Sequence, residues 1–536
     1  MKRLLALLLA LAMILMAFAG CATTTPSDDG TQPAGTNSNE PASGETTSGA
    51  ESAVDPVKFT FLRGVWGSAT YTPDGAFYNW IKDKTGVEIE CQIVPIAEYN
   101  DKVKTIVAST DLPDLMMADG PTSDYWSEVE DAGAFAPIEE YLEKYPVLKN
   151  LASDTVWEML RNDDGHIYFL PRCILAEEPF TLMYRQDLFE EAGLSEPTTI
   201  TELEDVLRAI KEKYPDMIPL TVGGANPQWM LKDLATCWNG AMLSGWKLDE
   251  NGDLIPGHAD EDAIDFVFWV QQMRDEGLID YEVGLTNDDG YGNATFDAGK
   301  SVMHVCNGMQ YVDRVTNIKR TDATAEVGIC SPLVGIDGTQ GGSASYFGMN
   351  KGYYVAATAS DKIDAIMKYI AWSLQDEEAT EFRLYGIEGE NFYYDNDGTL
   401  RYVTDINPEY ASTQREPLLI VDLPEESTNW RSVKIYFELN GIDEYWDYYY
   451  EKTSQWLEVK YPNYISPLTR SETDTAIGVE LTQAYLASYW SVGIMTNSAI
   501  TRSEYENALA AWKDAGGQQI IDEYNANQVD KSKPVY

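Results

Sequence analysis

The chain has 536 residues, of which 44% are hydrophobic and 12% aromatic, so it can bury a sizeable core and is long enough for two or more domains. Its 38 lysines and arginines against 87 aspartates and glutamates give a formal net charge of −49. This charge argues against nucleic acid and anionic lipid surfaces as partners, and it disfavours a polyanionic ligand.

The first 20 residues are typical of a signal peptide. Lys2 and Arg3 are followed by an apolar run over residues 4–18 and by small residues before Cys21. This run is shorter than the about 20 apolar residues that span a bilayer, so we expect the mature protein not to cross the membrane. The segment 18–21 (FAGC) resembles the lipobox of bacterial lipoproteins, which implies diacyl lipidation, with chains such as palmitate, at Cys21. An ordinary secretory signal with a fortuitous cysteine stays open as the alternative.

Residues 21–54 are predicted to be the lipidated cysteine and a disordered tether. The segment is mostly Thr, Ser, Gly, Pro, Asn, Ala and acidic residues, and it has no Lys, Arg or aromatic residue. Such a stretch cannot bury enough apolar surface to offset the entropy lost on ordering.

The folded part is predicted to open as a β-loop-α-β unit. The pattern indicates strands over residues 59–63 and 88–94 with a helix over 77–85 between them. A further helix over 102–109 leads to a buried strand over 115–118. This alternation predicts an α/β protein with a largely parallel sheet covered by helices on both faces.

Three amphipathic helices are predicted further along the chain. The first begins at a capping box formed by Thr201 and Glu204. The second covers residues 361–375 behind the candidate cap Ser360, and the third covers 503–515 and ends at a Gly-Gly pair. Their apolar stripes belong to the core of the protein.

Signatures of catalysis and of metal binding are sparse, and we expect no cofactor and no metal. The three histidines are far apart in sequence, which makes a His-based zinc site improbable. The Asx-Gly segments 249–253 and 395–398 lack the glutamate at the twelfth position of a calcium loop and are interpreted as hairpin turns. The segment 298–301 (AGKS) is interpreted as a turn. A glycosidase needs only two carboxylates, so the sequence leaves that activity open.

Several segments, in order, resemble the bacterial extracellular solute-binding proteins of family 1, especially the long lipoprotein branch associated with oligosaccharide uptake. The segments are 107–114 (VASTDLPD), 165–172 (GHIYFLPR), 183–189 (MYRQDLF) with 192–199, 296–303 (FDAGKSVM), 386–390 (GIEGE) and 512–524. One segment departs from many relatives: 213–220 (KYPDMIPL) is shortened where they have an Asp/Asn-rich loop resembling a calcium site.

The resemblance implies a two-lobed α/β fold of the type II periplasmic-binding-protein kind, with discontinuous lobes and an interlobe hinge. We expect lobe 1 over residues 55–172 and 333–425, and lobe 2 over 173–332 and mainly over the helical part 426–536. The chain is expected to cross between the lobes near 171–181 and to return near 331–334.

The resemblance further implies a receptor, not an enzyme, that captures a carbohydrate and delivers it to the permease subunits of an ABC importer. We expect a monomer that is anchored to the cell membrane by its lipid and faces the extracellular side. A tethered polysaccharide-degrading enzyme, a surface adhesin and a receptor for a peptide or amino sugar remain as alternatives.

A sugar ring presents apolar faces and hydroxyl edges, so its site needs exposed aromatic rings and planar polar groups. In α/β folds such groups lie on the loops that follow strands. This rule selects Trp66, Asp119, Trp126, Arg172, Trp229, Trp238, Asn307, Tyr311 and Tyr346 as ligand-binding candidates. Because they are aromatic and amide-rich, we expect a neutral or weakly charged oligosaccharide.

Overall fold

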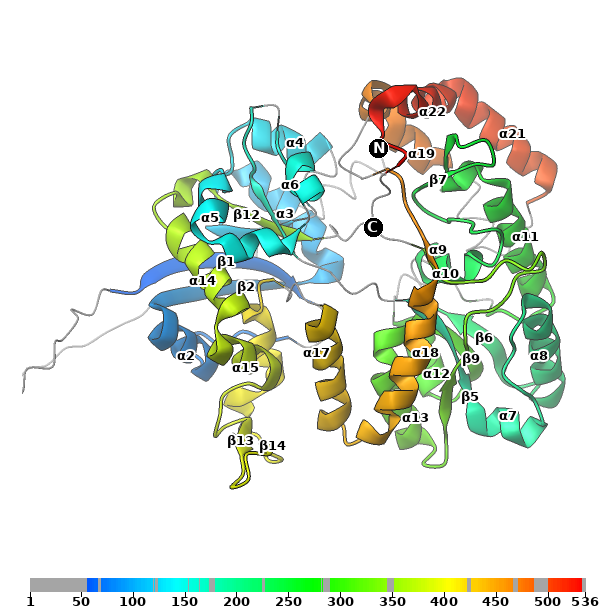
Figure 1. Cartoon of the computed structure of the whole chain (residues 1–536), viewed down its shortest axis with the longest axis horizontal. Coiled ribbons are helices and arrows are strands. Elements are labelled where there is room, and N and C mark those ends of the chain that lie inside the picture. Colours follow the sequence, from blue (N-terminus) through cyan, green and yellow to red (C-terminus); the bar gives the residue numbers. More distant parts are fainter. Residues whose placement is uncertain are drawn as a thin grey trace, which may run out of the picture. The chain divides into compact units, whose positions relative to one another are not determined.

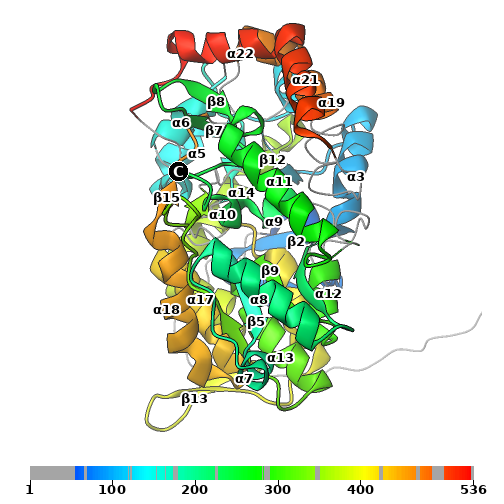
Figure 2. The ribbon, with the colours of Figure 1, turned by 90° about the vertical axis from the view of Figure 1, so that its right-hand side faces the viewer.

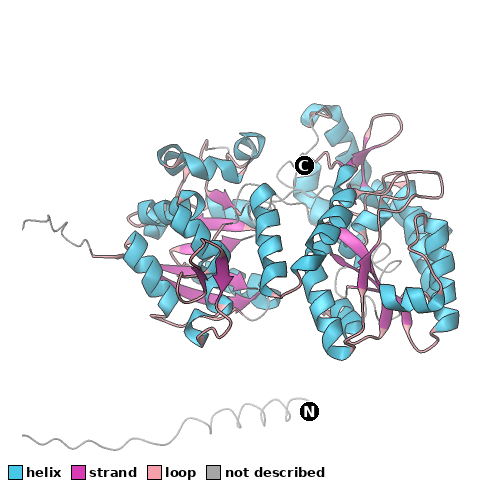
Figure 3. Cartoon of the chain, turned by 60° about the horizontal axis from the view of Figure 1, so that its bottom comes forward, coloured by secondary structure: helices cyan, strands magenta, loops and turns pink. Residues whose placement is uncertain are grey.

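A computed structural model describes residues 55–65, 69–118, 120, 124–152, 154–162, 164–172, 179–223, 227–280, 282, 290–344, 351–421, 426–465, 471–485 and 500–532. The predicted signal peptide, Cys21 and the tether lie outside the described residues. The segment Asp55–Tyr536 forms one compact unit. It contains two larger sheets, and in each of them helices enclose the strands (Figure 3).

The first sheet has five strands in the order β2-β1-β3-β12-β4. Figure 1 labels three of them, β1, β2 and β12. Their bounds are Val87–Pro95 for β2, Val57–Val65 for β1, Leu115–Ala118 for β3, Gly352–Val355 for β12 and Phe169–Pro171 for β4. β1 pairs in parallel with β2 and β3, whereas β12 is antiparallel to both β3 and β4. The predicted opening unit is therefore confirmed, and the sheet becomes mixed only where a distant segment joins it.

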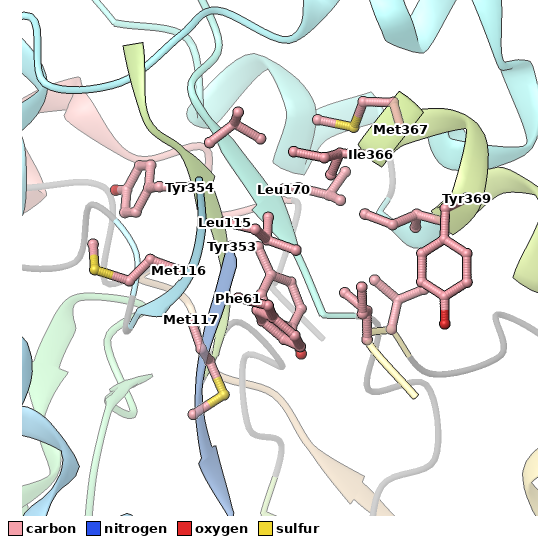
Figure 4. Close-up of a cluster of buried hydrophobic side chains, with 14 of the residues drawn as sticks. Phe61, Leu115, Met116, Met117, Leu170, Tyr353, Tyr354, Ile366, Met367 and Tyr369 are labelled. Atoms are coloured by element: carbon pink, nitrogen blue, oxygen red, sulfur yellow. The ribbon is translucent and has the colours of Figure 1, made fainter. Parts of the chain in front are cut away.

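The core of the first lobe lies on both faces of this sheet, because its central strands are apolar throughout. All four residues of β3 and all four of β12 are buried. Figure 4 shows Tyr354 and Met116 on one side of the sheet and Tyr353 and Phe61 on the other. The helices of this lobe are α2 (Ala76–Thr85), α3 (Ile96–Ser109), α4 (Asp124–Asp131), α5 (Glu139–Lys144), α6 (Asp154–Met159), α14 (Ile363–Gln375), α15 (Glu377–Tyr385) and α16 (Ser412–Arg415), and a hairpin joins β13 (Phe392–Tyr394) to β14 (Leu400–Tyr402).

The second sheet has four strands in the order β10-β5-β9-β6. Their bounds are Val327–Ile329, Phe180–Arg185, Ser301–Asn307 and Ile218–Val222. β9 is parallel to β6 and antiparallel to β5. The surrounding helices are α7 (Gln186–Ala192), α8 (Ile200–Lys213), α9 (Pro227–Met230), α10 (Lys232–Ala235), α11 (Glu261–Asp275), α12 (Tyr291–Asp297) and α13 (Tyr311–Thr321). Figure 2 shows α8, α11 and α12 on this lobe.

The C-terminal helices pack on the second lobe. α17 (Glu426–Leu439) and α18 (Trp446–Glu458) share a core with α13 and β10. α19 (Val479–Tyr485), α21 (Arg502–Trp512) and α22 (Gln518–Glu523) add side chains to the cores beside α11 and β8 (Leu254–Pro256). β8 forms a hairpin with β7 (Trp246–Leu248), and β11 (Ser343–Ala344) pairs in parallel with β15 (Lys460–Tyr461).

The predicted helices exist, but their ends differ from expectation. α8 is capped by Thr199, whose side chain accepts a hydrogen bond from Glu202 N, so the capping box at Thr201 and Glu204 is wrong by two residues. The same Thr-x-x-Glu spacing occurs twice in succession here, and Ile200 is already buried as the first residue of the helix. The Thr-x-x-Glu spacing alone therefore does not distinguish Thr199 from Thr201 as the N-cap of α8.

A second helix start needs correction. Ser360 does not cap α14, because a short 3-10 turn over Ala357–Ala359 precedes the helix and the cap position is Lys362. The Gly-Gly pair breaks the helical segment that begins with α21, as predicted, because Gly516 has the non-helical φ of 134°. A new helix, α22, follows directly.

The chain leaves the second lobe later than expected. Leu333 is fully buried in the second core, and Val334 forms bridges with Thr199 and Gln340. Contact with that lobe continues to β11, and the next described strand, β12, lies in the first sheet. The return expected near 331–334 is therefore wrong, and it falls between β11 and β12. The detailed lobe limits stay a prediction.

Candidate ligand-binding site

In the first sheet, the carboxyl ends of β1, β3 and β4 and the start of β12 share one edge. Gly352 pairs with Ala118 at the end of β3 and with Pro171 at the end of β4. Arg172 follows directly and donates its backbone N–H to the carbonyl of Lys351 at 3.0 Å. A Cβ atom on Gly352 would lie 2.2 Å from the ring of Phe169, so glycine is required for this close approach.

Four predicted ligand contacts belong to this edge by their place in the chain. Trp66 follows β1, Asp119 follows β3, Arg172 follows β4 and Tyr346 precedes β12. The Arg172 side chain is half-buried. Trp66, Asp119 and Tyr346 lie outside the described residues, so their role stays a prediction.

In the second sheet, the register places a second group of candidates on one edge. Asn307 ends β9 opposite Phe180, the first residue of β5. Val222 ends β6 opposite Val305 of β9, so the end of β6 lies at the same edge. The Asn307 Oδ1 atom accepts from Met309 N at 2.8 Å and thereby caps the 3-10 turn Gly308–Gln310. This cap holds a half-buried amide where the strand ends.

Trp229 lies on α9, a short helix that follows β6 at this edge. Its ring is half-buried and meets the ring of Phe180 edge-on, with 6.2 Å between the centroids. The Nζ atom of Lys232 lies 5.7 Å from the centroid of each of the two rings. A cation over two aromatic faces is favourable and fixes their positions. The structure therefore brings Trp229 and Asn307 together as candidates.

The start of α12 adds polar groups to this edge that the sequence reasoning missed. Tyr291 and Asn293 are half-buried, as is Gln310 in the turn after β9. The Tyr291 hydroxyl donates to Asp280 Oδ2 at 2.9 Å. Burial and this hydrogen bond raise the pKa of Tyr291 to about 12. The one sequence signal was an aromatic residue and an amide just before the recognised segment 296–303.

A buried histidine supports these amides. His304 Nε2 lies 2.9 Å from Asn293 Oδ1, and Asn293 Nδ2 donates to Gln310 Oε1 at 3.1 Å. The other ring nitrogen, Nδ1, lies 3.2 Å from the carbonyl oxygen of Thr221. Burial lowers the pKa of His304 to about 3, so the ring is neutral at physiological pH. The result is a chain of polar contacts from the core to a half-buried amide.

Three predicted contacts lie inside packed aromatic clusters. Trp126 is 6% exposed and stacks on Tyr354 with 5.4 Å between centroids. Tyr311 is fully buried and donates its hydroxyl to the carbonyl of Val327 at 2.9 Å. Trp238 is half-buried beside two aromatic rings of α11. These surroundings give each ring a packing role, and ligand contact by them stays a prediction.

Metal ligation finds no support in the described part of the chain. No group of three or more His, Cys, Asp or Glu side chains is placed there to hold an ion. Asp249 Oδ1 accepts from the backbone N–H groups of Asn251 and Asp253, each at 2.8 Å, as expected for a hairpin turn. The turn at Asp395, between β13 and β14, uses its carboxylate in the same way toward Asp397 N and Thr399 N.

A cavity of about 320 Å³ lies elsewhere, at the edge strand β2 of the first lobe. Its lining includes Tyr71, Tyr78, Asn79 and Glu90, and it contains none of the predicted contacts. Within the part of the chain that the structure describes, no helix has both the length and the apolar character to span a membrane.

A sequence profile described as bacterial extracellular solute-binding protein matches residues 68–380, which is more than half of the chain. The chain therefore belongs to this family of binding proteins, as the resemblance implied.

Two relatives and one solved structure agree with this assignment. The Bacillus subtilis (strain 168) polygalacturonan/rhamnogalacturonan-binding protein YtcQ is 24% identical over 469 residues, covering 83% of this chain and 86% of the relative. Lipoprotein LipO of the same strain is 25% identical over 363 residues, covering 65% and 70%. The crystal structure of alginate-binding protein AlgQ2 without calcium ion superposes with a TM-score of 0.66 at 18% identity, covering 89% of this chain and 99% of that one. The expected two-lobed fold is confirmed.

Proposed function

We propose that this protein captures an oligosaccharide outside the cell and delivers it to the permease subunits of an ABC importer. One observation carries the proposal: in a chain of the solute-binding family, a half-buried tryptophan and several amide groups meet at the carboxyl edge of the second sheet. Carbohydrate names among the relatives support the class of ligand.

The chemistry of this edge suits a sugar. The Trp229 ring offers an apolar face for a pyranose or furanose ring, while amides both donate to and accept from hydroxyl groups. The amide groups available are those of Asn293, Asn307 and Gln310. Each already makes a hydrogen bond within the protein, which orients it before a ligand arrives.

The first lobe is proposed to supply the opposite contacts from Trp66, Asp119, Arg172 and Tyr346. A ligand that binds both lobes has a higher affinity for the closed state and shifts the population toward it. Permeases would then recognise the closed form. Small-angle scattering checks this step, because saturation with ligand should reduce the radius of gyration, and an unchanged radius would remove lobe closure from the proposal.

Calorimetry against a glycan panel tests the ligand class. The panel contains neutral oligosaccharides, oligogalacturonides, alginate fragments and short peptides. We expect saturable binding of a neutral or weakly charged oligosaccharide, because Arg172 is the one cationic candidate in a strongly acidic protein. Tight binding of the acidic fragments alone would show that the ligand is an acidic oligosaccharide and not a neutral one. Binding of peptides alone would overturn the carbohydrate proposal.

A tethered polysaccharide-degrading enzyme is the rival activity. The family and the relatives are binding proteins. Release of reducing sugar from the same panel by purified protein would refute the receptor function.

Lipid anchoring at Cys21 is the proposed means of retention at the cell surface. The lipobox-like segment supports it, as does the name of the relative LipO. We expect Cys21→Ser to release the protein into the medium and to abolish incorporation of labelled palmitate. Cys91→Ser serves as the control and should leave labelling intact. Continued labelling of the Cys21→Ser protein would refute the assignment.

A further inference from the structure

A buried ion pair lies beside the candidate site in the second lobe. Lys232 and Asp233, on α10, are 5% and 0% exposed, and Lys232 Nζ lies 2.6 Å from Asp233 Oδ1. Burying two charges costs several kcal/mol unless hydrogen bonds satisfy them, so the remaining partners of this pair indicate what it holds in place.

Those partners come from the two segments through which the chain passes between the sheets. Asp233 Oδ2 accepts from the backbone N–H of Phe180 at 2.7 Å, and Oδ1 accepts from the backbone N–H of Ala344 at 2.8 Å. Lys232 Nζ donates to the carbonyl of Ala344 at 3.1 Å. Phe180 is the first residue of the second sheet after β4, and Ala344 ends β11, the last strand before β12 of the first sheet.

Thr236 forms a hydrogen bond to only one of these two segments, the one that ends at Ala344. Its Oγ1 atom accepts from Gly342 N at 2.9 Å, two residues before Ala344. A substitution of Thr236 should therefore affect the segment that ends at Ala344 and leave the segment at Phe180 intact.

The same lysine contacts the proposed ligand platform. Its ammonium group lies over the rings of Phe180 and Trp229, 5.7 Å from each centroid. Because Lys232 is already buried, a sugar stacked on Trp229 would act on it through this ring, by holding the ring in place against the ammonium group.

We propose that Lys232 and Asp233 are positioning residues that clamp two interlobe crossings, β4 to β5 and β11 to β12, to the second lobe and couple the ligand contact at Trp229 to lobe closure. A third passage, from Val421 to α17, is not held by this pair. Because one carboxylate holds the two clamped crossings, they start from a common rigid point and respond together. The coupling rests on the proposed function of Trp229, whereas the clamp itself needs no ligand.

The clamp is tested without ligand by amide hydrogen exchange in Asp233→Asn and Lys232→Met. Loss of a charge-assisted hydrogen bond should speed exchange of the Phe180 and Ala344 amides roughly 10- to 100-fold. Thr236→Val should speed exchange at Gly342 and not at Phe180. Asp260→Asn is the matched control: it removes another buried partner in this lobe, 2.9 Å from Lys247, and should leave both amides protected. Acceleration at only one of the two amides in Asp233→Asn, or at neither, would overturn the clamp.

The coupling is then tested with the glycan that the panel identifies. Lys232→Met should weaken binding and reduce the ligand-dependent change in radius of gyration more than Asp260→Asn does. If Lys232→Met binds and closes like the control, the coupling is wrong even though the clamp stands. If the unmodified protein binds no glycan, the proposed function and the coupling both fail, and the exchange result still decides the clamp. Should Asp233→Asn fail to fold, Lys232→Met and Thr236→Val carry the exchange test.

Discussion

Acidification from pH 8 to pH 5 should lower the free energy of unfolding by about 2 kcal/mol for each of two buried histidines. Burial lowers the pKa of His304 to about 3 and that of His258 to about 4. Their pKa in the unfolded chain is about 6.5. As the pH falls below about 6.5, the two histidines bind protons in the unfolded chain but stay neutral in the folded protein. The free energy of unfolding therefore decreases toward pH 4.

Urea titrations of the parent protein and of His304→Gln at both pH values check this result. The variant is expected to lose less stability on acidification, by about 2 kcal/mol, whatever its stability at pH 8. Carboxyl groups whose pKa is raised in the folded protein, such as that of Asp297, favour the folded state on acidification. Their contribution is the same in the parent protein and in the variant, so it cancels when the two are compared.

The exposed His166 provides the control. Its pKa is raised by the hydrogen bond with Glu139, so this pair contributes stability at low pH that is lost as the pH rises. His166→Gln should therefore leave the loss between pH 8 and pH 5 undiminished. An acid sensitivity that His304→Gln does not reduce would show that a protonated ring is tolerated in the core.

Trp229→Ala should weaken oligosaccharide binding by about 1 to 3 kcal/mol, or roughly 5- to 150-fold in Kd, if the ring carries a sugar face. The expectation follows from its half-buried ring at the same edge of the second sheet as the Asn307 amide. Trp229→Phe should retain part of the affinity, because a smaller aromatic face remains. Calorimetry with the glycan from the panel measures both variants.

Trp238 is the matched control in the same lobe. Its ring packs against Phe266 and Trp269, with centroids 4.8 and 5.2 Å away. Trp238→Phe is therefore expected to lower the free energy of unfolding and to change Kd less than Trp229→Ala does. If Trp229→Ala leaves Kd unchanged and Trp238→Phe raises it, the sugar contact is made by Trp238 and not by Trp229.

Local sequence predicted the secondary-structure elements well where a segment has a clear hydrophobic periodicity or a recognisable turn sequence. The strand over 115–118 agrees residue for residue with β3, and the Asx-Gly segments form the turns expected of them. These features depend on neighbours within a few residues, so they can be inferred without knowing the fold. The alternation of strands and helices predicted the α/β class, and the resemblance of the ordered segments to solute-binding proteins implied the two-lobed architecture.

Tertiary structure decided how deeply each predicted ring is buried. Trp126, Trp229 and Tyr311 all lie in the same kind of sequence, an aromatic residue near the start of a helix. Their exposure differs because their neighbours come from distant parts of the chain: Tyr354 covers Trp126, while β10 and α18 enclose Tyr311.

The same reason explains the groups that were missed. Asn293 and Gln310 join the candidate site because β9 pairs with β6 and His304 reaches from that strand to Asn293. The clamp at Asp233 likewise joins Phe180 to Ala344, which are far apart in sequence. The sequence by itself therefore determined the α/β pattern and most elements, since these rest on local periodicity, and the resemblance of its segments to solute-binding proteins implied the family. The exposed rings, the oriented amides and the second crossing depend on contacts between distant residues, which only the tertiary structure specifies.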